Sequence, residues 1–245
     1  MRFDEKSVIV TGGALGIGQA VCRILAERGA AVAIFDWDEK AGNETCEEIK
    51  ENGGRAIFQK VDVADFKAVE NAANLARSTF GKINSLVVSA GIQRYGTAVS
   101  TPEEQWEEVL NVNLRGAWNA ARASIPFLRE AGGGTIVNVS SVQALASQQN
   151  VLAYTVSKHG LVGLTRSTAM DFAKENIRAN CVCPGTVDTP MLKWAASLDS
   201  NPQSVYDACN AMHPLGRIAQ PREIAEVIAF LAHESSSFVT GAVWA

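Results

Sequence analysis

The sequence predicts an α/β fold, a single domain built on a doubly wound parallel sheet of about seven strands with helices on both faces. Strand-like and helix-like stretches alternate from one end of the chain to the other, as they do when helices connect parallel strands. Residues 31–35 are continuously apolar rather than alternating, which is typical of a strand buried on both faces. A glycine-rich turn also joins the first expected strand to the first expected helix.

The expected elements follow one another closely along the chain. Seven stretches have the apolar, β-rich character of buried strands: residues 7–10, 31–35, 56–61, 86–89, 135–140, 178–183 and 242–244. From Ile17 the apolar residues fall at helical spacing, and Gly29 is placed to end that helix. Further helices are expected over residues 39–51, 66–80, 102–131 and 152–175, with a last long helix after residue 216.

No linker, repeat or low-complexity tract divides the chain, so residues 1–245 are expected to form one domain. Residues 189–216 are less regular than the rest. They contain Pro190, Pro202 and Pro214 and two short stretches of helical character. Because this segment lies between the end of a strand and the last long helix, it is a candidate substrate lid.

Composition excludes several classes of protein. The chain has 245 residues, of which 47% are hydrophobic and 20% charged, which is unlike a disordered chain or a disulfide scaffold. The net charge of -4 argues against a nucleic-acid-binding surface. No apolar run approaches the ~18 residues of a membrane span, and the first six residues lack the apolar core of a secretion signal. We therefore expect a cytoplasmic protein that binds neither nucleic acid nor membrane.

The five cysteines are odd in number and follow no framework spacing, and the three histidines lie far from them in sequence. Reduced structural thiols and no metal site are therefore expected.

The glycine-rich turn, residues 11–18, reads TGGALGIG. Glycines between a strand and a helix let backbone N–H groups approach a pyrophosphate, and the helix N-terminus adds a favourable dipole. The spacing, Gly-x3-Gly-x-Gly, differs from the commoner Gly-x-Gly-x2-Gly of dinucleotide sites. Taken alone, these glycines also fit a purely structural turn.

Acidic residues at the end of the second strand favour NAD as the cofactor. Asp36 lies 18 residues after Gly18, where a carboxylate can accept hydrogen bonds from the ribose hydroxyls of an adenosine. Asp38 and Glu39 follow Trp37, and no basic residue appears before Lys40. A 2′-phosphate would be repelled there, so NADP is disfavoured. Asp38 also fits a helix N-cap. Asp62 and Val63, at the end of the third strand, are expected beside the adenine, although Asp62 fits a helix entry as well.

A candidate chemical site lies in the helix expected over residues 152–175. Tyr154 and Lys158 share a face of that helix at i and i+4. A tyrosine with its usual pKa of about 10 is a poor base near neutrality, and a neighbouring ammonium favours its phenolate. The same spacing also fits a tyrosine and a lysine that are solvated on an exposed helix and have no catalytic role. However, Ser141 ends the fifth strand 13 residues earlier, at the sheet edge where such folds bind ligands.

Together these motifs resemble the short-chain dehydrogenase/reductase family, whose fold is a Rossmann-type sheet. The glycine turn matches, Asn113 matches the catalytic asparagine, and Ser141, Tyr154 and Lys158 match the other catalytic positions. The matches are ordered over residues 7–241. The cofactor-binding set implied by the turn, the acidic residues and these matches is Gly12, Leu15, Gly16, Ile17, Gly18, Asp36, Trp37, Asp62, Val63, Ser89, Ala90, Gly91, Tyr154, Lys158, Pro184, Gly185, Val187 and Thr189.

The resemblance implies a role for each catalytic residue. Tyr154 is the general base when an alcohol is oxidised and the acid when a ketone is reduced. Ser141 holds the substrate oxygen, and Lys158 lowers the pKa of Tyr154 and binds the nicotinamide ribose. Asn113 holds a water that connects Lys158 to solvent. The residues from Pro184 onward meet the nicotinamide carboxamide.

The sequence departs from the family in two places. Ser89 stands where the family has the asparagine of Asn-Ala-Gly, which mainly steadies the sheet. The sequence also ends at Trp244 and Ala245 without the Val-Asp-Gly-Gly-like tail, and we expect a loss of this tail to weaken the last strand and one oligomer interface. The resemblance implies a homo-oligomer, a dimer or tetramer, formed through helices near residues 102–131 and 152–175.

The residues that follow these motifs suggest a small polyhydroxy substrate, a sugar or polyol, because amides bind hydroxyl groups and an aromatic face packs on a sugar ring. The residues expected to face the substrate are Gln93, Arg94, Tyr95, Gln143, Gln148, Gln149, Asp188, Trp194 and His213, and the four main candidates among them are Gln93, Gln143, Gln148 and Trp194. Three alternatives stay open. One is a 3-oxoacyl-carrier-protein reductase using NADPH, the second a dehydrogenase of apolar alcohols, and the third a non-catalytic NAD-binding regulator.

Overall fold

A computed structural model describes residues 1–245 and shows one α/β domain. Its seven strands are all parallel and lie in the order β3-β2-β1-β4-β5-β6-β7. Their bounds are β1 Ser7–Thr11, β2 Ala31–Asp36, β3 Arg55–Lys60, β4 Ser85–Val88, β5 Gly134–Val139, β6 Ile177–Val182 and β7 Val243–Trp244. The order reverses between β1 and β4, and ligands bind at the carboxyl ends of the strands at such a switch point.

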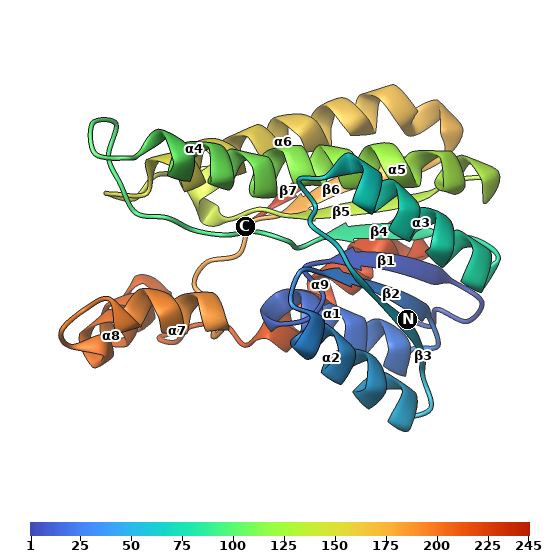
Figure 1. Ribbon diagram of the computed structural model, residues 1–245, viewed down its shortest axis with the longest axis horizontal. Coiled ribbons are helices and arrows are strands. Elements are labelled where there is room, and N and C mark those ends of the chain that lie inside the picture. Colours follow the sequence, from blue (N-terminus) through green and yellow to red (C-terminus); the bar gives the residue numbers. More distant parts are fainter.

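Helices cover both faces of the sheet (Figure 1). One face carries α1, α2 and α9, whose apolar side chains pack with Val8, Val10 and Ile34. The other carries α3, α4, α5 and α6, with Ile9, Phe35 and Leu86 in the core between α3, α5, α6 and the sheet. The bounds are α1 Gly16–Glu27, α2 Glu39–Glu51, α3 Phe66–Phe80, α4 Glu103–Leu110, α5 Gly116–Glu130, α6 Leu152–Phe172 and α9 Pro221–Ala232. The predicted fold class is confirmed.

The helix predicted over residues 102–131 is interrupted, which corrects the expectation of a continuous one. Between α4 and α5 the chain forms a π-helical turn, Asn111–Arg115. Inside this turn the Asn113 side chain bonds twice to the backbone of Ile92, accepting from its N–H (2.8 Å) and donating to its carbonyl (2.9 Å). π-helical turns are frequent at functional sites.

The less regular segment forms two short helices, α7 Pro190–Ser197 and α8 Pro202–Met212, as predicted. They stand away from the body of the molecule (Figure 1), and α8 buries none of its side chains. At the base of this arm, the chain entering α7 and the chain leaving α8 pair through Val187 and Ala219. No helix of the protein has the length and apolar character needed to cross a membrane.

Candidate active site

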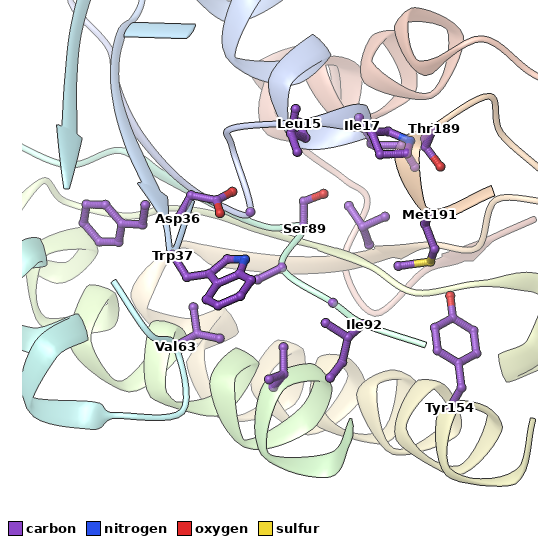
Figure 2. A pocket seen from close by; sticks show the side chains of 18 of the residues that line it. Leu15, Ile17, Asp36, Trp37, Val63, Ser89, Ile92, Tyr154, Thr189 and Met191 are labelled. Atoms are coloured by element: carbon purple, nitrogen blue, oxygen red, sulfur yellow. The ribbon is translucent and has the colours of Figure 1, made fainter. Parts of the chain in front are cut away.

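A cavity of about 570 Å³ opens at the switch point of the sheet, where the sequence places the glycine turn, the acidic strand end and the tyrosine. Figure 2 shows Asp36 and Trp37 at one end of this cavity and Tyr154 at the other, with Leu15 and Ile17 along one side. Fourteen of the predicted cofactor residues line it: Gly12, Leu15, Gly16, Ile17, Asp36, Trp37, Asp62, Val63, Ser89, Ala90, Gly91, Tyr154, Lys158 and Thr189.

The glycine turn has the shape of an anion cradle. Gly12 and Gly16 adopt positive φ angles of 67° and 58°, which residues other than glycine rarely adopt. A Cβ on Gly12 would lie 2.5 Å from the backbone nitrogen of Ala90, and one on Gly18 only 2.0 Å from the carbonyl oxygen of Gly12. Helix α1 starts here with no side-chain cap, so its N-terminus faces the cavity without a competing side chain. The turn fits a pyrophosphate.

Asp36 connects the glycine turn to the end of β2. One carboxylate oxygen accepts from the Ala14 N–H at 3.0 Å and the other from the Asp38 N–H at 3.1 Å. Each oxygen keeps a lone pair for a further donor, as a ribose hydroxyl would supply. Asp38 caps α2 by accepting from Ala41, as its N-cap interpretation predicts. The Trp37 side chain is 79% exposed at this edge of the cavity.

The charges around the cavity give a 2′-phosphate no free cation. Arg94 and Lys158 are the only basic residues that line it. The Arg94 guanidinium pairs with Glu108 at 2.7 Å. The Lys158 ammonium lies 5.4 Å from the ring centre of Tyr154, which is at the end of the cavity opposite Asp36. Lys60 faces Asp36 in the sheet register, but its ammonium pairs with Glu39 at 3.1 Å.

Tyr154 and Lys158 are both buried near the start of α6. Burial raises the pKa of Tyr154 to about 12, and a hydrogen bond with Ser141 acts in the opposite direction. Burial lowers the pKa of Lys158 to about 8. The Lys158 ammonium donates to the Val139 carbonyl at 3.0 Å and lies 5.4 Å from the centre of the Tyr154 ring. The predicted pair is therefore adjacent and dry rather than solvated.

Ser141 and Asn113 flank this pair without lining the cavity. Ser141 accepts from the Gln143 N–H at 3.2 Å, which fixes its hydroxyl near the turn after β5. The Asn113 amide also donates to Ser157 at 3.0 Å, so its side chain ties the π-helical turn to α6. The predicted water relay through Asn113 stays a prediction.

The remaining predicted residues lie outside the lining of the cavity. Among the cofactor set these are Gly18, Pro184, Gly185 and Val187. The substrate candidates Gln93, Gln143, Gln148 and Trp194 do not line it either. Gln143 donates to Gln148 at 2.7 Å, and the Trp194 ring stacks on Tyr95 with centroids 5.8 Å apart. Both ring nitrogens of His213 are bonded to backbone atoms.

Several lining residues were missed by sequence reasoning: Phe35, Val61, Ile92, Glu108, Val112, Val139, Ser140, Pro190 and Met191. Phe35 and Val61 precede predicted residues at strand ends, so their positions carried a usable signal. Met191 did not, because its place depends on how α7 packs. Figure 2 shows its side chain and the Tyr154 hydroxyl pointing toward each other at one end of the cavity.

Replacing Lys158 with methionine should stabilise the protein near neutral pH. Between about 8 and 10.5 the unfolded chain holds the lysine proton more tightly than the folded chain, so stability rises with pH through that window. Below that pH window, the buried Lys158 cation lowers the free energy of unfolding by about 3 kcal/mol. Methionine removes this cost but also loses the hydrogen bond to the Val139 carbonyl, which takes back about 1 kcal/mol of the gain. Urea unfolding should show Lys158→Met more stable by about 2 kcal/mol at neutral pH, with the advantage vanishing as the pH rises past 10.5.

The control is Lys174→Met, which removes an exposed lysine just after α6. It should show no such pH-dependent gap. A Lys158→Met protein that is less stable than the wild type at neutral pH would contradict the assignment of a costly buried cation.

Comparison with known proteins decides the family. The model of a family described as enoyl-(acyl carrier protein) reductase matches residues 12–245. The chain belongs to the short-chain dehydrogenase/reductase family. It is an oxidoreductase that acts on CH–OH groups, and members of this family use nicotinamide cofactors.

Relatives within this short-chain family act on different substrates. The cis-4-hydroxycyclohexanecarboxylate dehydrogenase of Sinomonas cyclohexanicum is 39% identical over 99% of this chain and 95% of its own length. The 3-oxoacyl-[acyl-carrier-protein] reductase of Thermotoga maritima is 35% identical over 99% and 96%. The solved aldohexose dehydrogenase of Thermoplasma acidophilum has a TM-score of 0.89 at 34% identity and covers 99% of this chain and 92% of its own.

Proposed function

We propose that the protein is an NAD-dependent oxidoreductase that interconverts a secondary alcohol and a ketone or lactone, with Tyr154 as the acid/base. One observation carries the proposal: a single cavity joins the anion cradle at Gly12, the carboxylate of Asp36 and the buried Tyr154–Lys158 pair. The cradle would hold the pyrophosphate of NAD and Asp36 its ribose hydroxyls. When bound, NAD supplies the acceptor for the hydride, which is chemistry that side chains lack.

The side chains of the chain manage the proton. Tyr154 takes the proton of the substrate hydroxyl during oxidation and returns it during reduction. Burial disfavours its phenolate. A positive charge nearby favours a phenolate, and the Lys158 ammonium lies 5.4 Å from the ring centre. Ser141, fixed by Gln143, would hold the substrate oxygen near that phenol. Asn113 steadies this arrangement from the π-helical turn through Ser157.

We infer a small polyhydroxy substrate, a sugar or polyol. The hydrogen-bonded amides of Gln143 and Gln148 follow Ser141 in the sequence, and the rings of Tyr95 and Trp194 stack on each other, but all four residues lie outside the cavity lining. The similarity to an aldohexose dehydrogenase supports this substrate. Apolar Ile92 and Met191 toward Tyr154 favour a second candidate, an alicyclic alcohol of the kind named for the Sinomonas relative.

A rate comparison across substrates tests the proposal. Formation of reduced nicotinamide would be followed by absorbance, with NAD and with NADP, over aldoses, polyols, cyclohexanols and open-chain secondary alcohols. We expect NAD-dependent oxidation with the highest kcat/KM on an aldose or polyol. A preference for cyclohexanols would move the substrate to the second candidate. Activity confined to NADPH and a 3-oxoacyl thioester would overturn the cofactor and substrate assignments. NAD binding with no turnover on any alcohol would favour a regulator.

We also infer a homo-oligomer, a dimer or tetramer, formed through α4–α5 and α6. Leu110, Leu114, Trp118 and Leu164 surround a surface hollow there, and Trp118 is half-exposed. An apolar hollow of this kind is typical of a face covered by a partner. Light scattering should give a mass at least twice the chain mass of 26.1 kDa, and Trp118→Lys should lower it. A monomeric wild type would contradict this assembly.

We also infer a cytoplasmic location, because the five free cysteines fit a reducing compartment.

A further inference from the structure

His213 lies just past α8 and binds backbone on both sides of its ring. Its Nε2 atom is 3.0 Å from the Thr186 backbone nitrogen, which donates. Nε2 must therefore be the acceptor, and the ring proton lies on Nδ1, which is 2.7 Å from the Cys209 carbonyl. The ring is thus a bridge between the end of α8 and the chain that follows β6.

The segment that His213 contacts is residues 184–189, of which Thr189 alone lines the cavity. At one end the Pro184 carbonyl accepts from Val142 at 3.0 Å, next to Ser141. At the other end Thr189 lines the cavity, and its methyl carbon lies 3.3 Å from the position of a Cβ on Gly16. The segment therefore connects the Tyr154 end of the cavity to the glycine turn. A dinucleotide that reaches from that turn to Tyr154 would pass Thr189, the end of this segment.

Backbone hydrogen bonds to Ala219 fix the middle of this segment. The Thr186 carbonyl accepts from the Ala219 N–H at 3.0 Å, and the Asp188 N–H donates to the Ala219 carbonyl at 2.9 Å. The Thr186 N–H is held by the His213 ring. The ring is packed tightly at this point, because a Cβ on Gly185 would lie 2.4 Å from Nε2. Glycine at position 185 is thus required for the His213 contact itself.

We propose that His213 is a positioning residue that holds residues 184–189 against the nicotinamide end of the bound cofactor, so that the hydride-transferring carbon faces the substrate at Tyr154. This inference rests on the proposed function, since it needs NAD to bind in the cavity. It assigns to the end of the α7–α8 arm a part in orienting the cofactor, in place of the substrate contact expected from the sequence.

Two substitutions separate the two hydrogen bonds of the ring. The amide group of glutamine extends about as far as Nε2 of the ring, so it can accept from the Thr186 N–H. The shorter amide group of asparagine extends only as far as Nδ1, so it can donate to the Cys209 carbonyl but cannot contact Thr186. For each variant, kcat would be measured along with the dissociation constants of NADH and of ADP-ribose, which lacks the nicotinamide. His213→Asn should lower kcat and weaken NADH binding, each by about tenfold, because a small misplacement of reacting groups is costly. ADP-ribose binding should stay unchanged. His213→Gln should keep kcat and the NADH dissociation constant within about threefold of the wild-type values.

Several outcomes would overturn the inference. One is a His213→Asn protein with the kcat and NADH affinity of the wild type. Another is equal loss of NADH and ADP-ribose binding, with a lower Tm, which would mean a merely structural role. Failure of His213→Gln to rescue would show that the Thr186 contact is not the one that matters. A wild-type protein that binds neither NADH nor ADP-ribose would instead refute the proposed function on which the inference rests.

Discussion

Replacing Tyr154 with phenylalanine should lower the rate of alcohol oxidation by about 10²- to 10⁴-fold while NADH still binds. The change removes one hydroxyl group and keeps the ring that packs beside Lys158. It takes away the only phenol in the cavity, so the substrate proton has no matched acceptor. Initial rates of nicotinamide reduction under saturating NAD and alcohol measure the loss, and calorimetric titration with NADH measures the retained binding.

The matched control is Tyr206→Phe, which removes the same hydroxyl from α8, outside the cavity. It should keep the wild-type rate. A Tyr154→Phe protein within about threefold of the wild-type rate would refute the acid/base assignment. Loss of NADH affinity together with the rate would mean that the substitution damages the cavity rather than the chemistry.

Replacing Asp36 with asparagine should shift the cofactor preference toward NADP. The substitution removes the negative charge that would face a 2′-phosphate, and the remaining amide oxygen can still accept from the backbone near Ala14. Two like charges about 4 Å apart near a protein surface repel by about 4 kcal/mol, only part of which a rearranged ribose would feel. We expect the ratio of kcat/KM for NAD to that for NADP to fall by about 10- to 100-fold.

Asp38→Asn is the control for this experiment. Its carboxylate lies outside the cavity lining and caps α2, and asparagine caps helices equally well. It should change the ratio much less than Asp36→Asn. A wild type that already prefers NADP, or an Asp36→Asn protein with an unchanged ratio, would show that Asp36 does not select the cofactor.

Elements with local boundary signals were predicted to the residue. The helices over residues 39–51 and 66–80 have the predicted bounds because their ends are encoded locally. Asp38 caps the first, and Gly81, with a φ of 80°, ends the second. Such signals act within one helical turn and are visible in a single sequence.

Features set by distant contacts could not be predicted in this way. Asn113, inside the π-helical turn, is bonded to Ile92, which is 21 residues away in the sequence. The pairing of Arg94 with Glu108 and the approach of Met191 to Tyr154 need the assembled fold. The contacts of His213 also depend on the assembled fold. Its place in the candidate lid, residues 189–216, suggested a substrate contact, whereas its ring is bonded to the backbone of Thr186 and Cys209.

The most direct test of hydride transfer is to follow the hydrogen itself. An aldose or polyol carrying deuterium at the carbon that is oxidised would be incubated with the wild-type protein and NAD, and the reduced cofactor analysed by mass spectrometry. We expect one deuterium on each reduced nicotinamide, and almost no product with Tyr154→Phe. Reduced nicotinamide without deuterium, or an equal yield from Tyr154→Phe, would contradict direct transfer between the alcohol carbon and NAD at Tyr154.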